Sequence, residues 1–228
     1  MKYSAALRRL SDGETSMNDF DNEILPTDPD EGEEITERVA GRETYEWVRS
    51  LVGAVLVITL LFTFVVRLMG VDGHSMVPTL QDGDYVALLS NLFMGDLEQG
   101  DVIVARKESF ENGEPIVKRV IATEGQTVDI LYDGNGYGTV YVDGEPLDEP
   151  YILEPMVLPY YDRTSFPLTV DEGCLVVMGD NRNRSADSRY ASIGQIEESQ
   201  VIGKVLCILF PGCGESSSRD FGRIGAVD

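Results

Sequence analysis

The chain has 228 residues, of which 43% are hydrophobic, so it is long enough for one ordinary domain with a real core and some additional segments. Its formal net charge of −22 argues against nucleic-acid binding, because phosphate contacts need clustered Lys and Arg. It has one histidine and three scattered cysteines, which excludes a metal site of several histidines and gives no zinc-binding spacing.

The N-terminal segment is acidic. Residues 1–46 contain thirteen acidic and five basic side chains. Within this segment, residues 11–37 have too few apolar side chains to offset the entropy lost on ordering. We therefore predict that residues 1–46 form an acidic, largely disordered tail.

Residues 47–70 are predicted to form a transmembrane helix. No charged residue occurs from Ser50 to Val66, and this stretch would be about 26 Å long as a helix. The hydrocarbon core of a bilayer is about 30 Å thick, and the side chains of Arg49 and Arg67 can extend to the two interfaces. A core helix and a cleaved signal peptide are the alternatives. The length of the apolar stretch disfavours the first, and the long segment before it disfavours the second.

The basic residues near this helix predict its orientation. Arg38, Arg42 and Arg49 precede or begin it, whereas Arg67 alone follows closely and the next basic residue is Arg106. The positive-inside rule then places the N-terminus in the cytoplasm. We expect a single-pass protein of the cell membrane, with residues 71–228 forming an extracytoplasmic domain.

This domain is predicted to be mainly β, with an antiparallel sheet. Turn signals separate seven short runs rich in Val, Ile, Leu and Tyr. Asp143-Gly144 suits a type I′ hairpin turn. The runs are "YVALLS", "DVIVAR", "PIVKRVIA", "TVDILY", "TVYVDG", "CLVVMGD" and "VIGKVLCILF".

The stretch "VDGHSMVPTL" at 71–80 places the single histidine, His74, directly before Ser75. A Ser-His-Asp triad needs the imidazole within hydrogen-bonding distance of the serine hydroxyl. If the segment is extended, neighbouring side chains point to opposite faces, and His74 then points away from Ser75. A histidine-based triad is therefore disfavoured.

A neutral lysine can also activate a serine, provided that burial lowers its pKa from about 10.4. Three lysines follow the predicted anchor. Lys107 lies in a polar turn, whereas Lys118 in "PIVKRVIAT" and Lys204 in "VIGKVLCILF" lie in apolar strands. Spacing alone leaves Lys118 and Lys204 as candidate bases.

Three segments, "GHSMVPTL", "VKRVIATEGQTV" and "VVMGDNRNRSADSRY", follow the predicted anchor in this order. Together they resemble the bacterial type I signal peptidases, and the single anchor resembles the Gram-positive type. The resemblance implies that Ser75 is the nucleophile, Lys118 the general base and Ser185 a residue that orients the lysine amine. It also implies that Asp187 and Arg189 form a supporting ion pair, and Asp180 and Arg182 belong to the same motif.

The sequence departs from some family members at Gly73, where Gram-negative proteins often have a serine that contributes to the oxyanion hole. The hole would then rest on backbone N–H groups, chiefly that of Ser75. The segment "ATEGQ" after "KRVI" also differs from the family's usual Gly-x-Pro-Gly-Asp, so the turn after the base strand is expected to differ.

The resemblance further implies a membrane-bound serine endopeptidase that removes signal peptides from preproteins after Ala-x-Ala sites through an acyl-enzyme. No metal or organic cofactor is expected. The expected partners are preprotein signal peptides, the lipid bilayer and a nearby secretion translocon. We expect the substrate pockets to be lined by four apolar residues: Val71, Met76, Leu80 and Val117.

Two alternatives remain. The chain could be an inactive membrane-anchored β module that binds peptides, but a degenerate member would be expected to lose Ser75 or Lys118, and both are present. It could also be a related peptidase dedicated to one substrate, which the sequence does not separate from a general signal peptidase.

Overall fold

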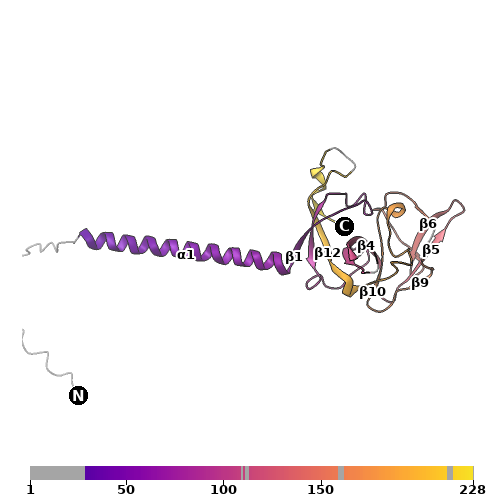
Figure 1. Cartoon of the computed structure of the whole chain (residues 1–228), viewed down its shortest axis with the longest axis horizontal. Coiled ribbons are helices and arrows are strands. Elements are labelled where there is room, and N and C mark those ends of the chain that lie inside the picture. Colours follow the sequence, from indigo (N-terminus) through magenta and orange to yellow (C-terminus); the bar gives the residue numbers. More distant parts are fainter. Residues whose placement is uncertain (1–28, 109, 111–112, 159–161, 215–217, 228) are drawn as a thin grey trace, which may run out of the picture. The chain divides into compact units, whose positions relative to one another are not determined.

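The structure is a computed structural model that describes residues 29–108, 110, 113–158, 162–214 and 218–227 (Figure 1). It divides the chain into two compact units, Met1–Gly53 and Ala54–Asp228. This division falls inside a helix and does not coincide with the predicted boundaries after residues 46 and 70.

The helix α1 spans Pro29–Phe64, so it begins earlier and ends earlier than predicted. The helix includes residues 29–46 of the predicted acidic tail, and residues 1–28 lie outside the described part of the chain. Proline is favoured in the first turn of a helix, where its missing N–H would have no partner within the helix.

The end of the predicted transmembrane segment is a strand rather than a helix. Strand β1, Val66–Gly70, pairs along its whole length with β2, Tyr85–Ser90. The β-branched residues Val65 and Val66 favour this change, because their side chains are less restricted in a strand than in a helix.

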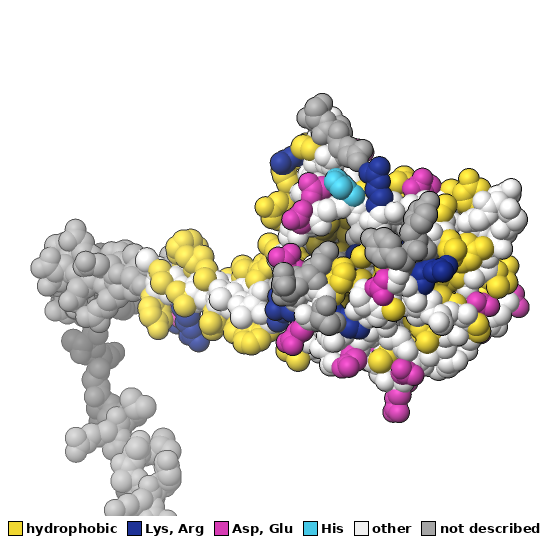
Figure 2. Space-filling model, turned by 45° about the vertical axis from the view of Figure 1, so that its right-hand side comes forward, with side chains coloured by type: hydrophobic (Ala, Val, Ile, Leu, Met, Phe, Trp, Pro, Cys, Tyr) yellow, Lys and Arg dark blue, Asp and Glu magenta, His cyan; other side chains and the backbone are white. Residues whose placement is uncertain are grey.

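The remaining helical segment keeps the composition of a membrane span. Thr44–Phe64 has a mean hydropathy of 2.0, and none of its apolar window is buried within the protein. In Figure 2, hydrophobic side chains lie along the visible face of the described part of this helix, with basic side chains among them. Length and composition thus fit a membrane-crossing helix.

Two antiparallel sheets form the β unit within the described residues. The larger has eight strands in the order β1-β2-β12-β3-β4-β10-β11, with β13 paired to β12. Its further strands are β3 Val102–Arg106, β4 Pro115–Ala122, β10 Cys174–Met178, β11 Ile196–Glu197, β12 Val201–Phe210 and β13 Gly225–Ala226.

The smaller sheet has the order β7-β6-β5-β9, with β8 paired to β6. Its strands are β5 Thr127–Tyr132, β6 Tyr137–Val142, β7 Glu145–Pro146, β8 Met156–Val157 and β9 Leu168–Thr169. Short 3-10 helices also occur: η2 Arg182–Arg184, η3 Glu198–Gln200 and η4 Phe221–Arg223.

This architecture confirms the predicted fold class. All seven predicted runs contain a strand, and β2, β4, β5 and β12 have the predicted limits. The predicted hairpin turn is also confirmed, because Asp143 and Gly144 between β6 and β7 have φ values of 53° and 86°. A type I′ turn requires positive φ at both central residues.

The middle of the larger sheet, at β3 and β4, is buried on both faces, which explains the continuous apolar runs there. Val102 and Val104 of β3 pack in one hydrophobic cluster, whereas Ile103 and Ala105 pack in another. Neighbouring β4 is buried at six of its eight positions. A polar side chain in β4 is therefore largely removed from water.

Candidate active site

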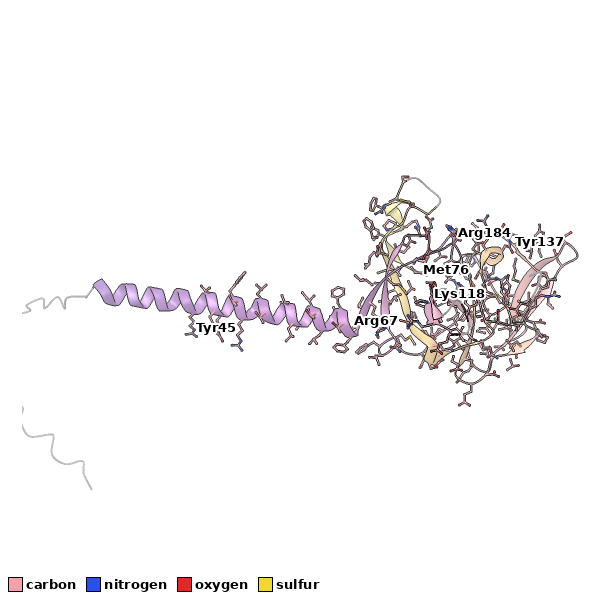
Figure 3. All side chains as sticks on the ribbon, viewed as in Figure 1. Tyr45, Arg67, Met76, Lys118, Tyr137 and Arg184 are labelled. Carbon is pink, nitrogen blue, oxygen red and sulfur yellow. The ribbon has the colours of Figure 1, made fainter. Side chains whose placement is uncertain are left out.

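Lys118 of β4 reaches the hydroxyl of Ser75. Its amine lies 2.9 Å from Ser75 Oγ and donates a second hydrogen bond of 2.8 Å to the Val117 carbonyl. Lys118 is only 5% exposed. Figure 3 places Lys118 in the interior of the β unit, near Met76, the residue after Ser75.

The two other lysines of the β unit have different surroundings. Lys204 forms an ion pair of 2.6 Å with Asp101, and 30% of its side chain is exposed. The Lys107 amine donates hydrogen bonds to the carbonyls of Ile193 and Gln195. Of the two strand lysines that the sequence left open, Lys118 is the one that contacts Ser75.

Ser75 lies in a turn region rather than in a strand. The Val77 N–H donates to the His74 carbonyl at 3.3 Å, which closes a turn around Ser75. Our alternation argument assumed an extended segment, so its premise is wrong. The His74 side chain is nevertheless exposed.

Gly73 begins this turn with a φ of 101°, a conformation that favours glycine, and its N–H donates to Asp82 Oδ1 at 2.9 Å.

The segment after β10 holds the Ser75 turn in place. The Asn181 N–H donates to the Ser75 carbonyl at 3.0 Å, and the Asn181 side-chain amide donates to the His74 carbonyl at 3.1 Å. A Cβ added at Gly179 would lie closer than 3.0 Å to both the Ser75 carbonyl and Ser185 Oγ. The two segments therefore meet at a glycine because no side chain fits between them.

Ser185 lies beside this contact and is 5% exposed. Its hydroxyl is buried and makes no hydrogen bond of ordinary geometry to the described residues. It nevertheless lies close enough to Asp187 to help stabilise that carboxylate. The structure thus provides a buried hydroxyl near the Ser75 backbone.

Asp187 and Arg189 form a buried ion pair. Arg189 Nε and Nη2 each lie 2.8 Å from an Asp187 oxygen, and the Gly179 N–H donates to the same carboxylate at 3.0 Å. Burial alone would raise the pKa of Asp187, but the charge and hydrogen bonds of Arg189 outweigh it and lower that pKa. Arg189 also donates to the Arg182 carbonyl, which fixes the loop.

Asp180 and Arg182 of this motif form ion pairs with residues outside it. Asp180 accepts two hydrogen bonds from Arg119, at 2.9 and 2.8 Å, and both side chains are buried. Arg182 forms a two-pronged ion pair with Glu149. The sequence did not identify Arg119 or Glu149 as site residues. A charged residue next to Lys118 in an apolar strand was a usable signal for Arg119, whereas nothing marked Glu149.

The far end of the Ser75 turn is anchored as well. Thr79 donates a hydrogen bond of 2.5 Å to Asp180 through its hydroxyl, and its carbonyl accepts one of 3.1 Å from Arg223. Arg223 also pairs with buried Asp84 at 2.7 Å. The C-terminal segment and the motif after β10 thus hold the same turn.

The apolar residues expected to line substrate pockets pack together in one hydrophobic cluster. Val71 and Met76 are buried, and Val117 is partly buried against the same cluster. Leu80 has no exposed surface, so it packs in the core and does not line an open groove. Of these four side chains, Val117 is the most accessible to a substrate.

Comparisons with known proteins identify the family of this chain. The family model "Signal peptidase, peptidase S26" matches residues 44–210. Signal peptidase I of Bacillus licheniformis is 33% identical over 173 residues, covering 73% of this chain and 89% of that protein.

Probable signal peptidase I-1 of Synechocystis is 37% identical over 168 residues and covers 71% of this chain and 79% of that protein. Signal peptidase IB of Staphylococcus aureus is 32% identical over 186 residues and covers 75% of this chain and 91% of that protein. A solved signal peptidase I from Enterococcus faecalis is 30% identical, covers 49% of this chain and 97% of that chain, and has a TM-score of 0.37.

The resemblance found in the sequence is thereby confirmed. The family model spans most of the chain, and the relatives share about a third of their residues with it. The chain therefore belongs to the signal peptidase I family, peptidase S26, whose members are serine peptidases that remove signal peptides.

Proposed function

We propose that Ser75 and Lys118 form the catalytic dyad of this signal peptidase. The observation that carries the proposal is the 2.9 Å hydrogen bond between Lys118 Nζ and Ser75 Oγ. A lysine serves as a general base when its amine is neutral, and the burial of Lys118 favours the neutral form over the ammonium ion.

The proposed reaction proceeds in two stages. Ser75 Oγ attacks the scissile carbonyl carbon while its proton moves to Lys118 Nζ. Lys118 then gives this proton to the leaving amine, and the peptide bond breaks to leave an acyl ester on Ser75. In the second stage, Lys118 accepts a proton from water, whose oxygen attacks the ester. The proton returns to Ser75 Oγ as the ester bond breaks.

The backbone around Ser75 suits stabilisation of the developing oxyanion. The Ser75 N–H donates no hydrogen bond to any residue that the structure describes, so it is free to bind a substrate oxygen. Asn181 holds the carbonyls of His74 and Ser75. These contacts fix the direction of the Ser75 N–H before the substrate arrives.

Ser185 is proposed to orient the amine of Lys118 during the reaction. Its buried hydroxyl lies beside the Ser75 backbone, with Gly179 between them. The Asp187–Arg189 ion pair is proposed as the support of this hydroxyl, because Arg189 contacts the backbone on either side of it. Ser185, Asp187 and Arg189 do not accept a proton in this mechanism.

An open strand edge beside Lys118 offers a place for an extended substrate. Within the described residues, β4 pairs with β10 only at Arg119, Val120 and Ala122. The first half of β4, from Pro115 to Lys118, is therefore unpaired on this side. We propose that the cleavage segment adds a strand here, with Val117 contacting a small residue of the Ala-x-Ala site.

The enzyme is membrane-anchored, and its orientation is part of the proposal. Arg38, Arg42 and Arg49 precede or begin the apolar stretch, which favours a cytoplasmic N-terminus and an extracytoplasmic β unit. A substrate delivered by a secretion translocon would present its cleavage site on that side of the bilayer.

Cleavage of a preprotein by the purified full-length enzyme in detergent tests the dyad. Ser75→Ala and Lys118→Ala should each lower kcat by at least about 1,000-fold, because each removes a group that acts in bond breaking. Lys204→Met is the matched control, because it removes a strand lysine that does not contact Ser75, and it should retain appreciable activity. Substantial cleavage by a folded Lys118→Ala variant would overturn the proposed base.

A further inference from the structure

A polar cleft of about 650 Å³ lies in the β unit at a site that the peptidase reaction does not use. Segments distant in sequence line it: Arg67 from β1, Asn91 after β2, Arg106 and Lys107 at the end of β3, and residues 199–202. It lacks Ser75 and Lys118, so it is separate from the proposed dyad.

The cleft contains two cations without a counter-charge. Arg67 and Arg106 are exposed, and the guanidinium group of neither forms an ion pair or hydrogen bond with a described residue. Lys107 differs, because its amine is held by two backbone carbonyls. On a chain with a net charge of −22, two unpaired guanidinium groups in one cleft mark a place where an anion is favoured.

The acidic residues of the cleft do not cancel these charges. Glu197 accepts a hydrogen bond of 3.1 Å from Ser199 and takes part in the capping box of η3. Glu108 is exposed and is not within ion-pair distance of either arginine. The carboxylates therefore leave both guanidinium groups available to a ligand.

The position of the cleft points to a ligand at the membrane surface. Arg67 follows the last residue of the apolar helix, Phe64, by three positions, and Figure 3 shows it at the start of β1. Its neighbour Leu68 is 59% exposed. Leu92 and Phe93, which directly follow Asn91 of the cleft, are 73% and 53% exposed. Apolar side chains thus adjoin two lining residues, an arrangement that suits a ligand with a polar head and an acyl chain.

We propose that this cleft binds the phosphate headgroup of an anionic membrane lipid. Guanidinium groups form two-pronged hydrogen bonds with phosphate oxygens, and the Asn91 amide can donate to an ester or hydroxyl oxygen of the headgroup. Bound lipid would offset the repulsion between an acidic protein and an anionic bilayer surface. The inference rests on the helix crossing the membrane, and not on the identity of the catalytic dyad.

Binding can be measured on the full-length protein in non-ionic detergent through the rise in unfolding temperature that a ligand produces. The probes are dihexanoyl phosphatidylglycerol, dihexanoyl phosphatidylcholine and inorganic phosphate. A salt concentration of about 0.3 M screens general attraction to charge. The variants are Arg67→Gln and Arg106→Gln. Arg163→Gln is the matched control, because Arg163 is an exposed arginine outside the cleft.

The proposal expects phosphatidylglycerol to bind more tightly than the other two probes. Arg67→Gln and Arg106→Gln should each weaken that binding about 10-fold, the loss of one charged hydrogen-bonding group, whereas Arg163→Gln should not.

Three results would overturn the proposal. If phosphatidylcholine binds as tightly as phosphatidylglycerol, the headgroup charge does not determine binding. If all three variants weaken phosphatidylglycerol binding equally, the lipid does not bind in the cleft. Binding of inorganic phosphate as tight as that of phosphatidylglycerol, with the same dependence on Arg67 and Arg106, would make free phosphate the ligand. Unfolding temperatures without any probe show whether each variant is folded.

Discussion

Gly179→Ala tests whether the position of Ser75 matters for cleavage, because it adds one methyl group next to Ser75 and removes no functional group. The new Cβ would lie closer than 3.0 Å to the Ser75 carbonyl oxygen, which is a backbone atom and cannot rotate away. A close carbon–oxygen contact needs about 3.3 Å, so the segment carrying Ser75 must move by a good fraction of an ångström. This movement also lengthens the 3.0 Å hydrogen bond from Asn181.

A misplacement of about 1 Å at a reacting group can cost about 100-fold in rate, so we expect Gly179→Ala to lower kcat by about 10- to 100-fold. The loss of stability should be about 1–3 kcal/mol, the usual cost of overpacking. The assay compares preprotein cleavage and unfolding temperature with those of Gly134→Ala, since a Cβ at Gly134 meets nothing within 4 Å. If Gly179→Ala cleaves as fast as Gly134→Ala, the close approach does not position Ser75.

His74→Ala should retain most of the preprotein cleavage, because the exposed imidazole has no role in proton transfer and Lys118 already contacts Ser75. A loss as large as that of Ser75→Ala in a folded protein would contradict this assignment. Asp187→Asn should destabilise the protein by about 3–5 kcal/mol at pH 7, because it leaves Arg189 buried without its counter-charge. Since the pKa of Asp187 is lowered in the fold, its contribution is present above the ordinary carboxyl pKa and is lost as the pH falls through the lowered value. The unfolding temperatures of wild type and variant should therefore converge below about pH 4, and a constant difference down to pH 2 would contradict the linkage.

Much of the fold was predictable because its signals are local. The runs that became β2, β4 and β12 are bounded by turn residues, and Asp143-Gly144 fits a single turn type. The change from helix to strand after Phe64 was not predictable in this way, because residues 65–70 are apolar apart from Arg67 and no turn residue separates them from the helix. Their pairing with β2, a contact distant in sequence, determines the strand.

Some features of the candidate site could likewise be predicted from the sequence, and others could not. Burial in an apolar strand identified Lys118 and Lys204 as candidates, and the resemblance to a family selected one of them. The partners of the charged residues could not be read from the sequence, because Asp180 pairs across 61 positions with Arg119 and Arg182 pairs across 33 with Glu149. The burial of Leu80 could not be read from the sequence either, since an apolar residue near a nucleophile can face the groove or the core.

The three ion pairs around the segment after β10 contribute more to the geometry of the site than to the stability of the fold. Arg119–Asp180, Arg182–Glu149 and Arg189–Asp187 are all nearly or fully buried. Removing such charges from water costs about as much as their attraction returns, so an apolar core would be at least as stable. Each pair, however, has a fixed two-pronged geometry, and the pairs tie the backbone around Gly179 to strands and loops on different sides. That backbone contacts the Ser75 carbonyl, and the proposed dyad, with a hydrogen bond of 2.9 Å, tolerates little movement. We infer that the pairs hold the Ser75 turn against β4 before the substrate binds.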